Sequence, residues 1–122
     1  MPTMELTSEK IIMEMKNNEV DWVYVSLCAD VSRVEVRKNG EVVKSEGNID
    51  YNSPEINQLR VDLQEIDGAE VIEKGRKKSG MVTRFQLGGS VWEATSVGIS
   101  NKFNRLTIQQ VELEANGAKI GQ

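Results

Sequence analysis

Apolar residues recur at helical spacing in two parts of the chain. In the longer part they form a single stripe, made of Ile56, Leu59, Leu63 and Ile66. This stripe predicts an amphipathic helix, and Ser53 followed by Pro54 is a typical helix start, with serine as the N-cap and proline in the first turn. A shorter helix is predicted from Thr7 or Ser8 to Lys16. Its apolar side consists of Ile11, Ile12 and Met15.

Elsewhere the pattern changes to the two-residue period of β-strands. Strands are predicted over residues 21–29, 33–38, 69–74, 81–87, 90–99 and 105–114, with a further one after Gly40. Apolar residues occupy both faces of 21–29, which predicts a central, covered strand, whereas 33–38 alternates and should keep one face in water. In 105–114 the apolar phase shifts across Gln109-Gln110. This shift indicates a β-bulge, and a helix is the weaker alternative for the segment.

Two pairs of turn residues, Asn39-Gly40 and Gly88-Gly89, indicate where strands reverse. Asn-Gly supplies the two positive φ angles of a type I′ hairpin turn. If both pairs are two-residue loops, the first hairpin should pair Lys38 with Glu41, Val36 with Val43, Glu35 with Lys44 and Arg33 with Glu46, and the second should pair Phe85 with Trp92 and Arg84 with Glu93. These pairs join opposite charges or apolar side chains, which favours the proposed registers.

The order of the elements predicts an α+β fold. We expect a mostly antiparallel sheet of about six or seven strands with two helices packed on one face. The 122 residues suffice for one domain with one hydrophobic core, so a single domain is predicted over 1–122. Residues 116–122 are expected to form a frayed tail.

The composition argues against catalysis. The chain contains no histidine, which is the usual general base and the commonest neutral metal ligand. Cys28, the one cysteine, lies among apolar residues and is expected to be a buried, slowly reacting thiol. Asp62 and Glu65 share a helix face and could begin an oxygen-ligand metal site, but the sequence places no second carboxylate pair opposite them. We therefore expect a protein that is not an enzyme and that binds no metal and no cofactor.

The sequence also suggests a location. It contains no run of about 18 apolar residues that could cross a membrane, so no membrane partner is expected. The first residues carry acids and lack the apolar core of a secretory signal. A cytoplasmic location is therefore the default expectation.

Charge is distributed unevenly along the chain, whose net charge is −4. Segment 41–73 has nine acidic and two basic residues, whereas segment 74–84 has five basic residues and no acidic one. An acidic surface could bind a basic partner by electrostatic complementarity, although a solvated surface that only aids solubility is the simpler interpretation. The candidate partner-binding acids are Glu41, Glu46, Asp50, Glu55, Asp62 and Glu65.

The basic residues Lys74, Arg76, Lys77, Lys78 and Arg84 suggest an alternative site for an anion. A phosphate-binding loop of the Walker type needs glycines at a set spacing followed by a helix, but here the spacing differs and a strand follows. Single-strand nucleic-acid binding favours aromatic residues among the bases, and none occurs between Glu73 and Arg84. A solvated hairpin tip bounded by Gly75 and Gly80 is therefore favoured over a phosphate or nucleic-acid site.

Three strings carry a resemblance to a known family: EVDWVYVSLCADVSRVEVRKNGEVV, INQLRVDLQEIDG and VWEATSVGISNKFNRLTIQQVELE. Together with the order of elements, they are similar to the YezG-like immunity proteins of bacterial polymorphic-toxin systems. The resemblance covers most of the chain and carries over no individual binding residue. It implies a small cytosolic protein that neutralises a toxin, often a nuclease, by binding it.

The favoured hypothesis is therefore a non-enzymatic protein-interaction domain. It would be an inhibitor or immunity protein that binds a basic partner, such as a toxin or nuclease, through the acidic residues. One alternative is weak binding of nucleic acid or phosphate by the basic segment. The other is a small-molecule-binding domain with a pocket between the helices and the sheet, which aromatic residues such as Trp22 and Trp92 could line.

Overall fold

The computed structural model describes residues 6–28, 32–50, 52–78, 80–100, 103–113 and 119–120. Its elements follow the predicted order of helix, three strands, helix and four strands, and one further short strand comes after them. In chain order they are α1 (Ser8–Lys16), β1 (Trp22–Cys28), β2 (Ser32–Lys38), β3 (Glu41–Ile49), α2 (Pro54–Gln64), β4 (Glu70–Lys77), β5 (Gly80–Leu87), β6 (Ser90–Ser100), β7 (Phe103–Leu113) and β8 (Lys119–Ile120).

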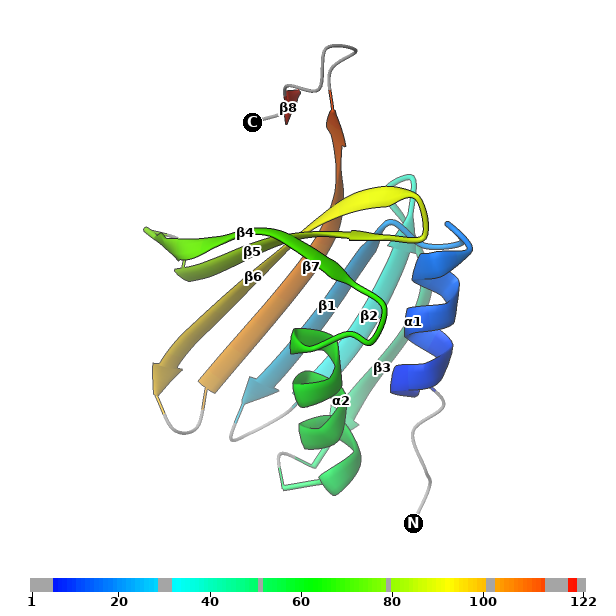
Figure 1. Cartoon of the computed structure of the whole chain (residues 1–122). Helices are drawn as coiled ribbons and strands as arrows, with labels where there is room; N and C mark the ends of the chain where they lie inside the picture. The colour runs from blue at the N-terminus through cyan, green and yellow to red at the C-terminus, as the bar shows by residue number, and fades with distance from the viewer. Residues whose placement is uncertain are drawn as a thin grey trace.

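The described strands form one antiparallel sheet in the order β3-β2-β1-β7-β6-β5-β4, and the two-residue β8 pairs with β7. Because β1 pairs with β7 in the middle, α2 carries the chain from one edge strand, β3, to the other, β4. Figure 1 shows both helices on the same face of the sheet. The predicted α+β fold with a mostly antiparallel sheet is confirmed.

Both helices begin as the sequence predicts. Thr7 is the N-cap of α1, and its Oγ1 accepts a hydrogen bond from the backbone N–H of Lys10 at 3.3 Å. Ser53 occupies the N-cap position of α2 and Pro54 its first turn, but the serine side chain makes no capping hydrogen bond. The carbonyl oxygen of Ser53 instead accepts hydrogen bonds from the backbone and side-chain N–H groups of Asn57.

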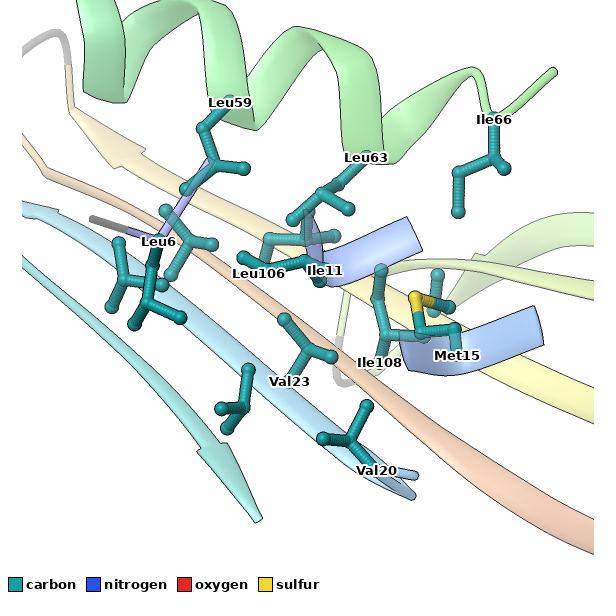
Figure 2. Packing of buried hydrophobic residues seen from close by; sticks show 14 of the residues in the cluster. Leu6, Ile11, Met15, Val20, Val23, Leu59, Leu63, Ile66, Leu106 and Ile108 are labelled. Carbon is teal, nitrogen blue, oxygen red and sulfur yellow. The ribbon is translucent and has the colours of Figure 1, made fainter. Parts of the chain in front are cut away.

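The core lies between the two helices and the sheet face that they cover, as Figure 2 shows. The predicted helix stripes supply one side of it, namely Ile11 and Met15 from α1, and Ile56, Leu59, Leu63 and Ile66 at α2. The opposite side comes from Val23, Val25, Val34, Val36, Phe85, Trp92, Leu106 and Ile108. Burial of these side chains stabilises the fold by about 1.5–3 kcal/mol each for the larger ones.

The second predicted hairpin register is confirmed. Phe85 lies opposite Trp92 and Arg84 opposite Glu93 across β5 and β6. The Arg84 guanidinium forms an ion pair with Glu93 at 2.8 Å. The indole Nε1 of Trp92 donates a hydrogen bond to the Leu87 carbonyl at 3.2 Å, so this fully buried ring keeps its polar atom satisfied.

The first hairpin register is correct only next to the turn. Asn39 and Gly40 have the φ angles of 53° and 82° that the turn requires, and Lys38 pairs with Glu41. Beyond that pair a bulge makes Val43 an extra residue on β3, so Lys44, not Val43, lies opposite Val36. The expected pairs further along the hairpin are therefore wrong as well. An edge strand tolerates such a bulge because it has no second neighbour whose register must be kept.

Later registers in this hairpin shift in the same way. Ser45, not Lys44, lies opposite Glu35, and Val34, not Arg33, lies opposite Glu46. The Glu46 carboxylate accepts a hydrogen bond from the backbone N–H of Leu6. The acid is therefore connected to the segment that precedes α1.

Segment 105–114 lies mostly in β7, so the helix alternative is wrong. The bulge predicted at Gln109-Gln110 is also wrong, because β7 pairs with β6 without interruption from Arg105 to Val111. The apolar phase shifts for a different reason. Leu106 and Ile108 face the helices, whereas Val111 lies on the opposite sheet face beside Val91.

Two other predicted boundaries change. Strand β4 continues to Lys77 and β5 begins at Gly80, so the hairpin tip predicted between Gly75 and Gly80 is reduced to a short turn. In the predicted frayed tail 116–122, residues 119 and 120 form β8. The remaining tail residues lie outside the described part of the chain.

Candidate interaction surfaces

The six predicted partner-binding acids are spread over two elements of the structure. Glu41 begins β3 beside the hairpin turn, and Asp50 follows the end of that strand. A strand of nine residues places its ends about 26 Å apart at roughly 3.3 Å per residue. Glu55 lies in the first turn of α2, and Glu65 is its C-cap. The structure therefore divides these acids between an edge strand and a helix.

Some of the acids have internal structural roles. Asp62 accepts a hydrogen bond from the Ser8 hydroxyl at 2.6 Å and another from the Gln58 side chain at 2.7 Å. The first of these bonds connects α2 to the beginning of α1. Asp62 and Glu46 therefore stabilise the arrangement of the α1 region as well as adding negative charge.

Asp62 and Glu65 do lie together at a hollow between the two helices. We call it the helix hollow; its volume is about 460 Å³, and it is lined by Ser8, Glu9, Ile12, Met13, Lys16, Asp62, Glu65 and Asp67. Among the described residues, its lining combines four acids with one base and two apolar side chains. Met13 is 61% exposed although it is a large apolar residue. Sequence reasoning found the α2 acids but missed Glu9 and Asp67, because only the packing of α1 beside α2 brings them close.

The predicted basic site is also divided. Lys74, Arg76 and Lys77 are exposed side chains of β4, and Lys78 lies in the turn that follows. Arg84 is buried in β5 and forms its ion pair with Glu93. Arg84 is therefore fixed in an ion pair on the sheet face opposite the core, and it does not belong with an anion-binding turn.

A cluster that the sequence did not reveal lies on the sheet face opposite the helices. We call Trp22, Tyr24, Arg33, Glu35 and Arg37 the arginine–aromatic cluster. The two rings are stacked with centroids 5.6 Å apart and planes 11° from parallel. The Arg37 guanidinium lies 4.5 Å from the Trp22 ring centroid, and the Arg33 guanidinium lies 5.7 Å from that of Tyr24.

Glu35 connects the two arginines of this cluster. Its Oε1 forms an ion pair with Nη2 of Arg33, and its Oε2 lies 2.5 Å from Nε of Arg37. The Glu35 side chain is only 5% exposed, whereas those of Arg33 and Arg37 are 46% and 39% exposed. The expected solvent-exposed face of 33–38 is therefore correct for Arg33 but wrong for Glu35. Trp22 and Tyr24 are half-buried, so β1 is only partly covered on this face.

A second hollow, of about 650 Å³, adjoins this cluster. Trp22 and Arg37 form part of its wall, together with Gln109 and Gln110 of β7. Gly40 and Gly89, from the two hairpin turns, also line it. We call it the hairpin hollow. The turns that the sequence predicted therefore frame a site whose side-chain composition it did not predict.

A third hollow, of about 660 Å³, lies between the end of α2 and strands β4 to β7. Apolar residues supply much of its wall: Leu63, Ile66, Ala69, Val71, Met81, Phe85, Ala94 and Leu106. It lies between helix and sheet, as the small-molecule hypothesis requires, but its described lining includes Phe85 and neither Trp22 nor Trp92.

In the part of the chain that the structure describes, no group of three or more histidine, cysteine, aspartate or glutamate side chains is placed to hold a metal ion. The expectation that Cys28 is buried is wrong, because this residue at the end of β1 is partly exposed. None of the described helices is long and apolar enough to cross a membrane.

Comparison with known proteins adds no relative from which a site could be transferred. No protein-family model, curated protein or solved structure matches the chain.

Proposed function

We propose that this protein is a non-enzymatic interaction domain that binds a basic protein through the helix hollow. The observation that carries the proposal is the combination of an exposed apolar side chain, Met13, with acids from both helices at one hollow. Apolar contact would supply affinity, and the acids would attract and orient a partner of opposite charge.

The chemistry of the hollow indicates the kind of partner. Among the described residues that line it, Glu9, Asp62, Glu65 and Asp67 outnumber the bases, of which there is one, Lys16. A partner that places lysine or arginine side chains around an apolar residue would complement this surface. The resemblance to YezG-like immunity proteins supports a more specific proposal, in which the protein is a cytoplasmic inhibitor of a basic toxin such as a nuclease.

Charge reversal at the hollow tests the proposal. The wild-type protein is first used to capture its partner from the native cell, and binding is then measured with both proteins purified. We expect Glu9→Lys/Glu65→Lys/Asp67→Lys to lower the association rate constant by about tenfold or more and to weaken its dependence on salt. Asp62 is left unchanged because it connects the two helices.

The matched control is Glu41→Lys/Asp50→Lys/Glu55→Lys, which changes the net charge equally at acids that lie away from the hollow. This variant should retain most of the association rate. If the control loses binding while the helix-hollow variant keeps it, the interaction surface is assigned to the wrong part of the molecule. A Met13→Ser variant with unchanged affinity would show that the apolar side chain contributes nothing.

A further inference from the structure

The arginine–aromatic cluster holds two cations in fixed positions on a sheet face that neither described helix covers (Figure 1). Each guanidinium lies against an aromatic ring on one side and bonds the same carboxylate, that of Glu35. These contacts restrict the rotamers of both arginines. Binding to such a surface loses little side-chain entropy, because the side chains are ordered before a partner arrives.

Fold stability alone does not account for this arrangement. Taking the Glu35 carboxylate out of water is costly, and an apolar residue at a buried ionic position often leaves stability equal or higher. Arg33 and Arg37 are substantially exposed, so water screens each ion pair, although removal of both arginines would leave the buried Glu35 carboxylate unpaired. The shared carboxylate does, however, hold both guanidiniums at one place on the sheet face.

The cluster retains binding capacity for an anion. The contacts with Glu35 use Nη2 of Arg33 and Nε of Arg37, and a guanidinium carries further N–H donors in a planar fork. Such a fork matches the two oxygens of a carboxylate. Two cations and one anion give the cluster a net positive charge within a chain whose net charge is −4.

The surroundings favour a protein as the anionic partner. Tryptophan, tyrosine and arginine are the residue types most enriched at energetically dominant positions of protein interfaces. The adjoining hairpin hollow, lined by Trp22, Arg37 and one acid, Asp21, among others, offers space for a side chain of the partner. Non-specific binding of single-stranded nucleic acid uses exposed ring faces for base stacking, whereas here guanidiniums and a neighbouring ring lie over the aromatic faces.

We propose that the arginine–aromatic cluster is a second interaction surface, which binds an acidic protein segment through carboxylates on Arg33 and Arg37. One side chain of that segment would enter the hairpin hollow. Face-to-face association of two copies is disfavoured because it would bring the same cations together. This inference does not rest on the function proposed for the helix hollow, and different residues test it.

The probe is a short glutamate-rich peptide that carries fluorescein and no tryptophan, and fluorescence anisotropy measures its binding. We expect Arg33→Gln/Arg37→Gln to weaken the affinity by at least about tenfold. The matched control is Arg76→Gln/Lys77→Gln in β4, which removes the same charge from exposed positions and should change the affinity by less than about twofold. Equal losses in the two variants would overturn the proposal, because they would show that only net charge matters.

A second variant covers the case in which removing both arginines destabilises the fold by leaving Glu35 unpaired. Arg33→Lys/Arg37→Lys keeps both charges but lacks the planar fork, and it should still weaken binding several-fold. Unchanged affinity in this folded variant would contradict bidentate recognition.

Acrylamide quenching gives an independent signal, because Trp92 is fully buried and Trp22 is not. Bound peptide should reduce the quenching of Trp22 emission by acrylamide. Unchanged quenching would mean that the peptide binds elsewhere.

Two further measurements test the kind of partner. A single-stranded oligonucleotide that binds more tightly than the peptide, with the same loss in the Arg33/Arg37 variants, would overturn the assignment to a protein. Sedimentation of the chain alone should show no self-association that these variants abolish. Such self-association would identify a second copy as the occupant and would equally overturn the proposal.

Discussion

Gly88 and Gly89 form one turn, yet substitution of each by alanine should have very different effects on stability. Both have positive φ angles, 61° and 79°, which cost an alanine about 1–2 kcal/mol. A Cβ atom at Gly88 would lie 2.5 Å from the backbone oxygen of Lys16 and 2.7 Å from its Cα. A Cβ atom at Gly89 would meet no heavy atom within 4 Å.

The overlap at Gly88 involves the backbone at the end of α1, so no side chain can rotate to relieve it. Either the β5–β6 turn or α1 must shift, and such overpacking typically costs a further 1–3 kcal/mol, roughly. We therefore expect Gly89→Ala to lower the free energy of unfolding by about 1 kcal/mol and Gly88→Ala to lower it by about 3 kcal/mol.

Urea denaturation followed by tryptophan fluorescence measures both losses, because the buried Trp92 of β6 becomes exposed on unfolding. Comparison within one turn removes the shared cost of the left-handed backbone, so the difference reports the contact between the turn and α1. Equal losses for the two variants would refute the close docking of this turn against the helix. A larger loss at Gly89 would refute the proposed turn geometry.

Three further predictions concern charged and reactive side chains. Replacing Arg76, Lys77 and Lys78 by serine should change the free energy of unfolding by no more than about 0.5 kcal/mol, since all three are exposed; a larger loss in urea denaturation would show a structural role. Arg84→Ala should cost about 3 kcal/mol in the same assay because it leaves a partly buried carboxylate unpaired, and a neutral result would contradict that pairing. Cys28 is partly exposed, so a thiol reagent should label the folded protein; labelling only after unfolding would show it to be protected.

The sequence by itself determined the features that depend on neighbouring residues. The apolar stripe of α2, the N-cap of α1 and the turn at Gly88-Gly89 each require only a few consecutive residues, and all three occur as predicted. The two helices and the antiparallel pairing of consecutive strands follow from them. The α+β class could therefore be predicted without any knowledge of long-range contacts.

Only the tertiary structure decided how distant segments meet. Glu9 and Asp62 line one hollow because α1 packs beside α2, and no periodicity in either segment predicts that contact. The bulge at Val43 is tolerated because β3 is an edge strand. β3 lies at the edge because β1 pairs with β7, which places the later strands on the far side of β1 from β2 and β3.

The arginine–aromatic cluster depends in the same way on which sheet face the helices cover. Trp22 and Val23 are consecutive apolar residues of β1, so the sequence predicted that both faces of this strand would be covered. The helices pack only on the side of Val23, because the apolar stripes of α1 and α2 fill one core. Trp22 is left half-buried on the other side, beside Arg37. Alternation within a strand shows that two faces differ, but the packing of the remaining elements decides which face stays accessible to a partner.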